Sequence, residues 1–185
     1  MSRLLILYGT TDGHTAKVAR FLAQELQAQG TDVDLIEAGT SDPDPRDYTA
    51  VIVAASVHAG GYQKAVVRWV RAHAPALGYT PSAFVSVCLG VLQLSPKVER
   101  ELTEIMKRFA VQTNWNPPRI KRVAGALLYT RYGWLKRMVM LHMVKTAGGS
   151  TDVSRDHEYT DWEDLRAFVK AFHAMCRVIA RHQAA

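Results

Sequence analysis

Short apolar runs alternate along this chain with longer stretches in which apolar residues recur at helical spacing. Runs rich in Leu, Ile, Val and Ala predict strands, and apolar residues at i, i+3 and i+4 predict helices. The expected strands are residues 3–8, 32–38, 50–56, 83–89 and 121–129. The expected helices are residues 13–29, 62–74 and 96–110, followed by a last helix that begins near residue 160.

This repeated alternation of strand and helix predicts an α/β fold. Residues 50–56, AVIVAAS, are apolar until the final serine, which is typical of a central parallel strand buried on both faces. Right-handed crossovers would then give a five-stranded parallel sheet with helices on both faces. We expect a single domain over residues 1–185, with any small ligand bound beyond the carboxyl ends of the strands.

The ends of the helices are also marked in the sequence. Gly30 is expected to stop the first helix. Thr160 and Glu163 stand at the spacing of a capping box, which predicts that Thr160 caps the last helix. The apolar stripe expected to face the core from that helix consists of Trp162, Leu165, Phe168, Val169 and Phe172.

One segment departs from the simple alternation. Residues 130–159, between the fifth strand and the last helix, form a connection far longer than most in α/β folds. We therefore interpret this segment as an insertion with a function of its own or as an elaboration of the fold.

The composition indicates which kinds of partner, compartment and metal site to expect. The 185 residues are 48% hydrophobic and carry a formal net charge of +6, which favours anionic partners. The two cysteines, Cys88 and Cys176, lack the spacing of a metal site or disulfide framework, so we expect a cytoplasmic protein without a metal. No apolar run reaches the roughly 20 residues that cross a bilayer.

The candidate chemistry lies at YGTTDGHT, residues 8–15, between the first strand and the first helix. Such a junction directs unpaired backbone N–H groups and the positive end of the helix dipole at one point. The hydroxyls of Thr10, Thr11 and Thr15 add neutral donors, and Gly13 permits a positive φ. The loop could therefore bind a phosphate without a lysine.

Asp12 is the residue that fits this interpretation least, because a carboxylate repels a phosphate unless its side chain turns away to cap the helix. The alternative is that residues 10–13 serve only as the N-cap of the first helix.

Other phosphate-binding classes fit less well. The loop lacks GxxxxGK, and Gly9 and Gly13 do not complete GxGxxG, although Glu37 stands where a ribose-binding acid would. A phospho-receiver needs acids at the ends of the first and third strands, where this chain has Tyr8 and Ser56.

Three stretches resemble a known family. They are TxDGxT at residues 10–15, ASVHAGGY at residues 55–62, and the long stretch from Ala124 to Trp162. The first resembles the FMN phosphate loop of flavodoxins, whose five-unit order the chain also matches. Together they resemble the flavodoxin-like, menaquinone-dependent protoporphyrinogen IX dehydrogenases over nearly the whole chain.

The resemblance implies three groups of FMN contacts. Around the phosphate it places Thr10, Thr11, Asp12, Gly13, His14 and Thr15. On one side of the isoalloxazine it places Ser56, Val57, His58 and Tyr62, and on the other Val87, Cys88, Leu89 and Gly90. Departures from the branch at Cys88, Gly90, Ala59 and Gly61 fall in the two flavin loops.

Some of these side chains have ordinary alternatives. A histidine at a helix start such as His14 is more often exposed than bound to a phosphate, and the same holds for His58 beside a flavin. Cys88 fits a buried strand residue better than a nucleophile, since no partner histidine is implied nearby.

The resemblance also implies an activity. FMN would oxidise protoporphyrinogen IX to protoporphyrin IX in haem biosynthesis, and menaquinone or ubiquinone would take the electrons. The alternatives are an FMN electron carrier without a small substrate, an NAD(P)H:quinone reductase, and a flavin-free domain with a binding or structural role. We expect no nucleic-acid partner and leave a homo-oligomer open.

Within the insertion, residues 131–147 mix cations with apolar side chains around most of a helical circumference. Such a helix needs an apolar neighbour, in its own domain, in a second subunit or at the inner face of the cell membrane. The residues expected to contact substrate carboxylates or anionic lipid are Arg131, Trp134, Lys136 and Arg137. The alternative is a solvated basic face over a buried apolar one.

Overall fold

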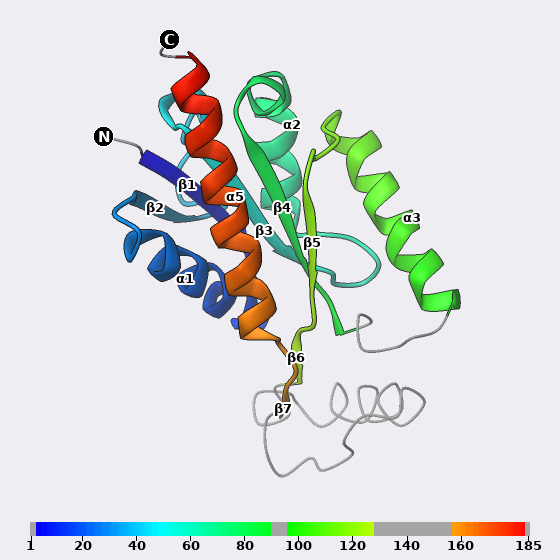
Figure 1. The fold of residues 1–185 in the computed structure, drawn as a ribbon. Coiled ribbons are helices and arrows are strands. Elements are labelled where there is room, and N and C mark those ends of the chain that lie inside the picture. The colour runs from blue at the N-terminus through cyan, green and yellow to red at the C-terminus, as the bar shows by residue number, and fades with distance from the viewer. Residues whose placement is uncertain (1–2, 90–95, 128–156, 184–185) are drawn as a thin grey trace.

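The structure, a computed structural model, describes residues 3–89, 96–127 and 157–183. Five parallel strands form one sheet in the order β2-β1-β3-β4-β5 (Figure 1). The strands are β1 (Arg3–Gly9), β2 (Asp32–Glu37), β3 (Ala50–Ser56), β4 (Ser82–Val87) and β5 (Ile120–Val123). The predicted α/β fold with a five-stranded parallel sheet is confirmed.

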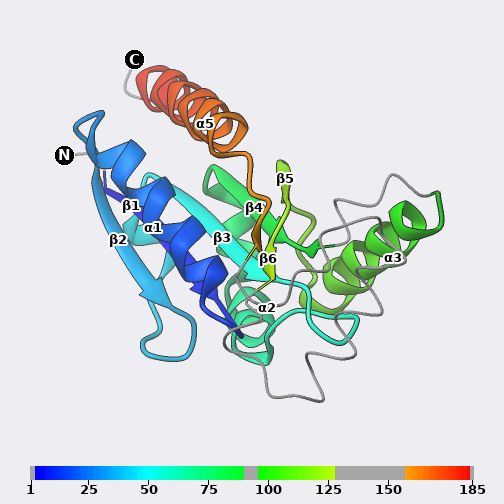
Figure 2. The same ribbon diagram turned by 90° about the horizontal axis from the view of Figure 1, so that it is seen from below.

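Helices cover both faces of this sheet, as Figure 2 shows. On one face lie α1 (His14–Gln27) and α5 (Trp162–Gln183), and on the other lie α2 (Lys64–Tyr79) and α3 (Pro96–Thr113). A short 3-10 helix, η1 (Pro45–Asp47), precedes β3. In the described part of the chain, no helix combines the length and the apolar composition needed to cross a membrane.

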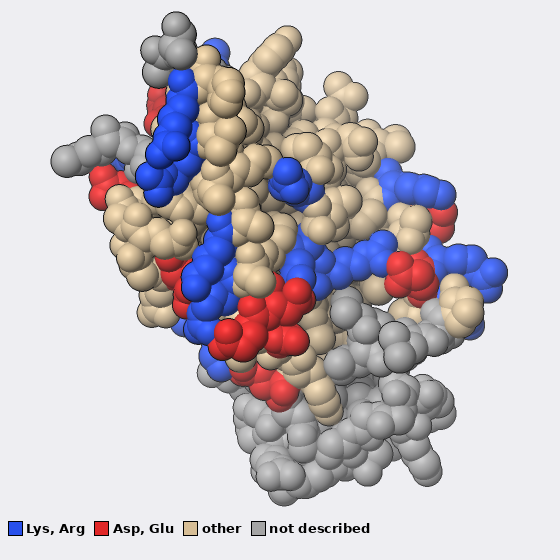
Figure 3. Space-filling model, viewed as in Figure 1, with Lys and Arg blue, Asp and Glu red and all other residues tan. Residues whose placement is uncertain are grey.

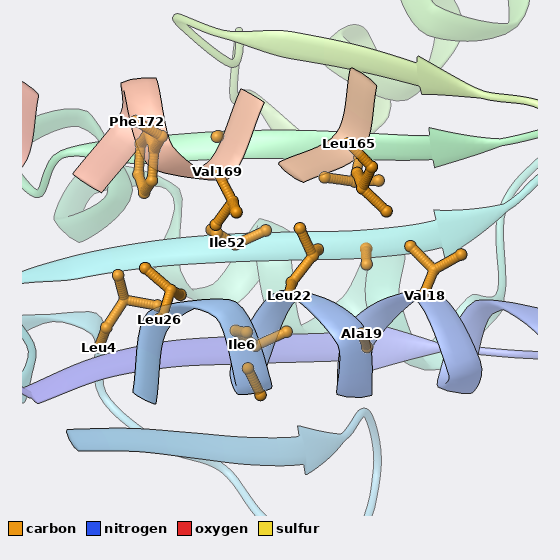
Figure 4. Close-up of a cluster of buried hydrophobic side chains, with 14 of the residues drawn as sticks. Leu4, Ile6, Val18, Ala19, Leu22, Leu26, Ile52, Leu165, Val169 and Phe172 are labelled. Carbon is orange, nitrogen blue, oxygen red and sulfur yellow. The ribbon is translucent and has the colours of Figure 1, made fainter. Parts of the chain in front are cut away.

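The alternating side chains of the strands divide the core into two layers. On β1, Leu4 and Ile6 face α1 and α5, whereas Leu5 and Leu7 face α2 and α3. Figure 4 shows the first layer, in which α1, α5 and the strands interdigitate. Burial on both faces is the reason that these strands read as continuous apolar runs. The result is a rigid sheet whose carboxyl ends, at the lower edge of Figure 1, carry the loops.

Helix α2 differs from its predicted range of 62–74. It begins at Lys64 and continues through Pro75 to Tyr79. Proline removes one backbone hydrogen bond from a helix, but Ala74 and Leu77 are buried on either side of it. Tertiary packing of these side chains holds the last turn in helical form.

The fifth predicted strand, residues 121–129, is divided in the structure. After β5 the chain leaves the main sheet, and β6 (Ala126–Leu127) pairs antiparallel with β7 (His157–Glu158). Tyr159 N donates to Gly125 O at 3.2 Å, which continues this pairing toward α5. The two ends of the segment 128–156 therefore meet as neighbours, directly before α5. Most of the predicted insertion lies outside the described residues.

The predicted capping box of the last helix is wrong. Asp161, not Thr160, caps α5: its Oδ1 accepts from Asp164 N at 2.9 Å, and its carbonyl accepts from Leu165 N at 3.1 Å. The Thr160 hydroxyl donates instead to Ala124 O at 2.7 Å. The apolar stripe of this helix is confirmed, with Leu165, Val169 and Phe172 buried and with Trp162 and Phe168 packed beside them.

Candidate functional site

Three loops meet at the carboxyl edge of the sheet, after β1, β3 and β4. Val57 N donates to Val87 O at 2.9 Å, which joins the loop after β3 to the end of β4. Gln63 Nε2 donates to Thr11 Oγ1 at 3.0 Å and to Ser56 Oγ at 2.6 Å, which joins the loops after β1 and β3. The fold thus brings together the loops that the sequence singled out.

The loop after β1 has the backbone of an anion-binding site. Gly13 is the N-cap of α1 and adopts a left-handed conformation with φ +93°, which favours glycine. Thr10 Oγ1 accepts from Gly13 N at 2.9 Å, so the Thr10 hydroxyl keeps its own proton to donate. Because Gly13 has no side chain to cap the helix, the N–H groups of the first turn of α1 suit an anion at this point.

The most informative atom at this loop is the hydroxyl of Thr15. Thr15 is only 1% exposed, and its Oγ1 is buried without a hydrogen-bond partner among the residues that the structure describes. A buried hydroxyl of this kind is costly unless some group completes its hydrogen bonding. A phosphate bound at the N-terminus of α1 would complete it.

The imidazole of His14 is buried, with 9% of the residue exposed, and is not exposed as its position at a helix start suggested. Its Nε2 lies 2.8 Å from Thr160 Oγ1. Because the Thr160 proton goes to Ala124 O, His14 Nε2 must be the donor in this pair. The ring therefore ties the first turn of α1 to the segment before α5, and burial lowers the pKa of His14.

This environment predicts a pH dependence of stability. The folded protein favours neutral His14, so below the unfolded-state pKa of about 6.5 the unfolded chain takes up the proton first. The free energy of unfolding should fall as the pH drops through this range, and His14→Gln, whose amide can donate to Thr160 without titrating, should weaken that dependence. Urea unfolding between about pH 5 and pH 7 measures the slope.

The control for this measurement is His173, whose pKa is also lowered, first by burial and then by Arg177. His173 contributes the same pH dependence to the unmodified protein and to the His14→Gln variant, so the difference between the two slopes reports on His14. An unchanged slope in the His14→Gln variant would contradict the prediction.

Lys17, one turn into α1, is already paired. Its Nζ lies 2.6 Å from Glu158 Oε2 and 5.1 Å from the centre of the Trp162 ring. Trp162 Nε1 donates to the other oxygen of Glu158 at 2.7 Å. The groups available to bind an anion at this loop are therefore backbone amides and hydroxyls rather than the Lys17 ammonium. This agrees with the absence of a lysine from residues 8–15.

The loop after β3 is a tight turn. His58 N donates to Gly61 O at 2.8 Å, and Gly61 N donates back to His58 O at 3.1 Å. The two central residues, Ala59 and Gly60, have φ values of +48° and +75°, the signs that a type I′ turn requires. Arg108 of α3 donates to Gly60 O at 3.0 Å and holds the turn against that helix. His58 is exposed at the base of the turn.

The positive φ of Ala59 predicts an effect of substitution. Left-handed backbone costs an L-residue about 1–2 kcal/mol, of which the larger unfolded-state entropy of glycine cancels part. Ala59→Gly should therefore stabilise the protein by about 0.5–1 kcal/mol in thermal unfolding. The reverse change at the neighbouring position, Gly60→Ala, should destabilise it; a loss of stability in Ala59→Gly would contradict this explanation.

Tyr62, which follows the turn, is partly buried and packs against the core. Its ring meets Phe84 and Phe109 edge-on, each with ring centres 5.0 Å apart, and its hydroxyl lies 2.8 Å from Ser86 Oγ. Burial raises the pKa of Tyr62 to about 12. The side chain thus anchors the end of the loop, and the flavin contact that the resemblance implies for Tyr62 stays a prediction.

The loop after β4 is only partly described. β4 ends at Val87, short of the predicted residue 89, although Cys88 N still donates to Val123 O at 2.9 Å. Cys88 and Leu89 are partly exposed at the edge of the sheet. Gly90, Arg131, Trp134, Lys136 and Arg137 lie outside the described residues.

The net positive charge does not form a patch over α5. Figure 3 shows Lys and Arg side chains on this face beside a group of acidic side chains. Lys121 pairs with Asp164, and Arg166 pairs with Glu163 and, at 2.9 Å, with Glu25. These pairs join α5 to β5 through Asp164 and to α1 through Arg166.

The strand order and the anion-binding loop after β1 define a flavodoxin-type domain. Residues 5–154 match the flavodoxin domain family. Among solved structures, oxidised flavodoxin 1 from Bacillus cereus is 14% identical and has a TM-score of 0.54, covering 94% of this chain and 98% of that one. The flavodoxin from Streptococcus pneumonia TIGR4 is 16% identical with a TM-score of 0.56, covering 94% and 99%.

Sequence relatives narrow the class further. Protoporphyrinogen IX dehydrogenase (quinone) from Escherichia coli K12 is 35% identical over 169 residues, which are 91% of this chain and 93% of that protein. The protein of the same name from Leishmania major is 34% identical over 177 residues, 94% of this chain and 75% of that protein. The chain belongs to the family of quinone-type protoporphyrinogen IX dehydrogenases.

One residue of this edge was missed by the sequence reasoning. Gln63 contacts both the loop after β1 and the end of β3. Its position directly after the HAGGY motif was the signal available, but a glutamine beside a predicted helix start has no distinctive pattern. Only the folded geometry gives it two partners from different loops.

Proposed function

We propose that this protein is an FMN-dependent enzyme that oxidises protoporphyrinogen IX and passes the electrons to a membrane quinone, menaquinone or ubiquinone. The family membership supports the substrate and the acceptor. The observation that supports the assignment of the cofactor is the buried Thr15 hydroxyl at the N-terminus of α1. It has no hydrogen-bond partner in the described part of the chain.

The residues of the loop after β1 suit the FMN phosphate. The hydroxyls of Thr10, Thr11 and Thr15 and the N–H groups of the first turn of α1 would donate to it, with Gly13 providing the close turn. His14 would contribute its backbone N–H, because its ring is bonded to Thr160. Asp12 is partly exposed in the same loop. Neutral donors and a helix dipole are sufficient for a phosphate.

The other two loops would enclose the isoalloxazine. Ser56, Val57 and His58 would contact one side, while Val87, Cys88 and Leu89, with Gly90 beyond the described residues, would contact the other. When bound, FMN would supply successive two-electron oxidations of the porphyrinogen, each balanced by reduction of one quinone to a quinol. The protein's part is to position the ring, limit the access of water and guide the substrate to it.

A cavity beside the flavin loop offers a place for the carboxylate arms of the substrate. It has a volume of about 610 Å³ and lies between Gly60 and α3. Its lining includes the cations of Lys97, Arg100 and Arg108 together with the carboxylates of Glu101 and Glu104, of which Glu104 is already paired with Lys107. Carboxylates pair favourably with such groups, and we place the arms of the porphyrinogen there.

The quinone is membrane-resident, so we propose peripheral contact with the inner face of the cell membrane. The ends of the segment 128–156 leave the fold at β6 and β7, close to α1 and the phosphate loop (Figure 1). Arg131, Trp134, Lys136 and Arg137 belong to that segment. Charge reversal at Arg131, Lys136 and Arg137 should reduce flotation with anionic vesicles and activity with vesicle-borne quinone; unchanged values would remove this part of the proposal.

The deciding experiment uses the purified protein. We expect a flavin spectrum and, with protoporphyrinogen IX under exclusion of oxygen, porphyrin fluorescence that appears only when a menaquinone analogue is added. Bound flavin without porphyrin formation would favour an electron carrier. Bleaching of the flavin by NAD(P)H alone would favour an NAD(P)H:quinone reductase. A colourless protein that does not take up FMN would overturn the cofactor assignment.

A further inference from the structure

Gln63 lies between the two loops that would hold the two ends of the cofactor. It is the N-cap of α2, and its carbonyl accepts from Val67 N at 3.1 Å, which fixes its backbone. From there its side chain reaches Ser56, at the end of β3, and Thr11, in the loop after β1. The other arm of the amide, Oε1, faces Gly9: a Cβ placed on that glycine would lie 3.1 Å from it.

The amide determines the direction of two other hydrogen bonds. Gln63 Nε2 carries two hydrogens, and the oxygens of Thr11 and Ser56 account for both. A hydroxyl oxygen that accepts from an amide keeps its own proton for a third group. The hydroxyls of Thr11, in the loop after β1, and of Ser56, at the end of β3, are therefore both available as donors.

The remaining polar atom of this side chain lacks a partner. Gln63 Oε1 is buried and has no donor among the described residues, as is the case for Thr15 Oγ1 in the same region. A buried carbonyl oxygen calls for a donor. The cofactor has donors of the right kind in the hydroxyls of its ribityl chain, which connects the phosphate to the ring system.

We propose that Gln63 sets the hydrogen-bond polarity of the cofactor site. Its amide directs the Thr11 proton to the phosphate and the Ser56 proton to the flavin ring system, and its Oε1 accepts from a ribityl hydroxyl. The inference rests on the proposed function, because it requires FMN at this edge of the sheet. It adds to that function a residue that serves both ends of the cofactor.

Two substitutions test the polarity. In Gln63→Glu, a carboxylate accepts from both hydroxyls and turns their protons away from the cofactor, and its charge repels the phosphate. We expect FMN to bind about 100-fold more weakly or worse. In Gln63→Met the hydroxyls are free to rotate, so the loss should stay near 10-fold. Titration of the apoprotein by quenching of flavin fluorescence gives both dissociation constants.

Binding of riboflavin distinguishes the contributions of the phosphate and of the flavin ring system to affinity. Riboflavin lacks the phosphate, so Gln63→Glu should weaken riboflavin binding less than FMN binding, whereas Gln63→Met should weaken both alike. In a Thr11→Val background, Gln63→Glu should reduce FMN affinity by a smaller factor, because the Thr11 proton is already absent. Gln112→Glu on the exposed side of α3 is the matched control and should leave both affinities unchanged.

The outcomes distinguish this inference from the proposed function. If the unmodified protein fails to bind FMN, the proposed function falls and this inference falls with it. If it binds FMN and oxidises the porphyrinogen while both Gln63 variants bind FMN with unchanged affinity, only the inference is overturned. Thermal unfolding of the apoproteins identifies a variant that fails to fold, in which case Gln63→Met alone decides between a 10-fold loss and none.

Discussion

The Thr15→Val variant is expected to bind FMN about 10- to 150-fold more weakly while its apoprotein remains at least as stable as the unmodified one. Valine has nearly the shape of threonine, and Thr15 is 1% exposed, so the substitution removes only the buried hydroxyl. A hydrogen bond to a charged group contributes about 1.5–3 kcal/mol, which sets the loss of affinity. Removing a buried hydroxyl without a partner in the described residues relieves a penalty in the apoprotein.

The opposite signs of these two effects make the measurement specific. Flavin fluorescence gives the affinity, and urea unfolding of the apoprotein gives the stability. Thr113→Val is the matched control, because Thr113 is also buried but donates to Phe109 O at 2.7 Å. That variant should lose stability and keep its affinity for FMN. Unchanged FMN affinity in Thr15→Val would mean that the phosphate is not held at the start of α1.

The second large effect is expected at Gly9, the last residue of β1. A Cβ there would lie 2.5 Å from Cγ2 of Val66, which is fully buried against the sheet. Because Val66 is fully buried on α2 and a valine in a helix strongly prefers one rotamer, Gly9→Ala should destabilise the protein by about 1–3 kcal/mol, the usual cost of overpacking a core. The same Cβ would press on Gln63, so FMN affinity should fall as well.

A double-mutant cycle checks the cause. Val66→Ala opens the space that the new methyl group needs, so Gly9→Ala should cost much less in that background, with a coupling energy of about 0.5–3 kcal/mol in urea unfolding. Gly78→Ala is the control: a Cβ at Gly78, near the end of α2, meets nothing within 4 Å. That change should be neutral or stabilising. Additive effects of Gly9→Ala and Val66→Ala would contradict the steric explanation.

The sequence predicted most of the strands and which loops share an edge of the sheet, because both follow from the pattern and order of the elements. The apolar run of β3 and the helical spacing of α1 are properties of consecutive residues, and the five-unit order determined which loops share an edge. The positive φ at Gly13 followed from the residue type and its position before a helix. These features involve no contact between distant parts of the chain.

The main errors involve contacts between distant parts of the chain. Thr160 matches a capping residue in its local sequence, yet Ala124 and His14, which lie 36 and 146 positions away, bind its hydroxyl. Asp161 therefore takes over the cap. The division of the fifth strand depends on pairing between residues 126–127 and 157–158. Gln63 was missed for the same reason, since its partners Thr11 and Ser56 become its neighbours only in the fold.

The antiparallel pairing of β6 with β7 also bears on how this enzyme can change over evolutionary time. Since both ends of the intervening stretch are joined side by side outside the main sheet, its length and content are exchangeable without shifting the register of β5 or the start of α5. A flavin-binding scaffold could thus gain, replace or lose chain at this junction. The redox core would keep its shape through each such exchange.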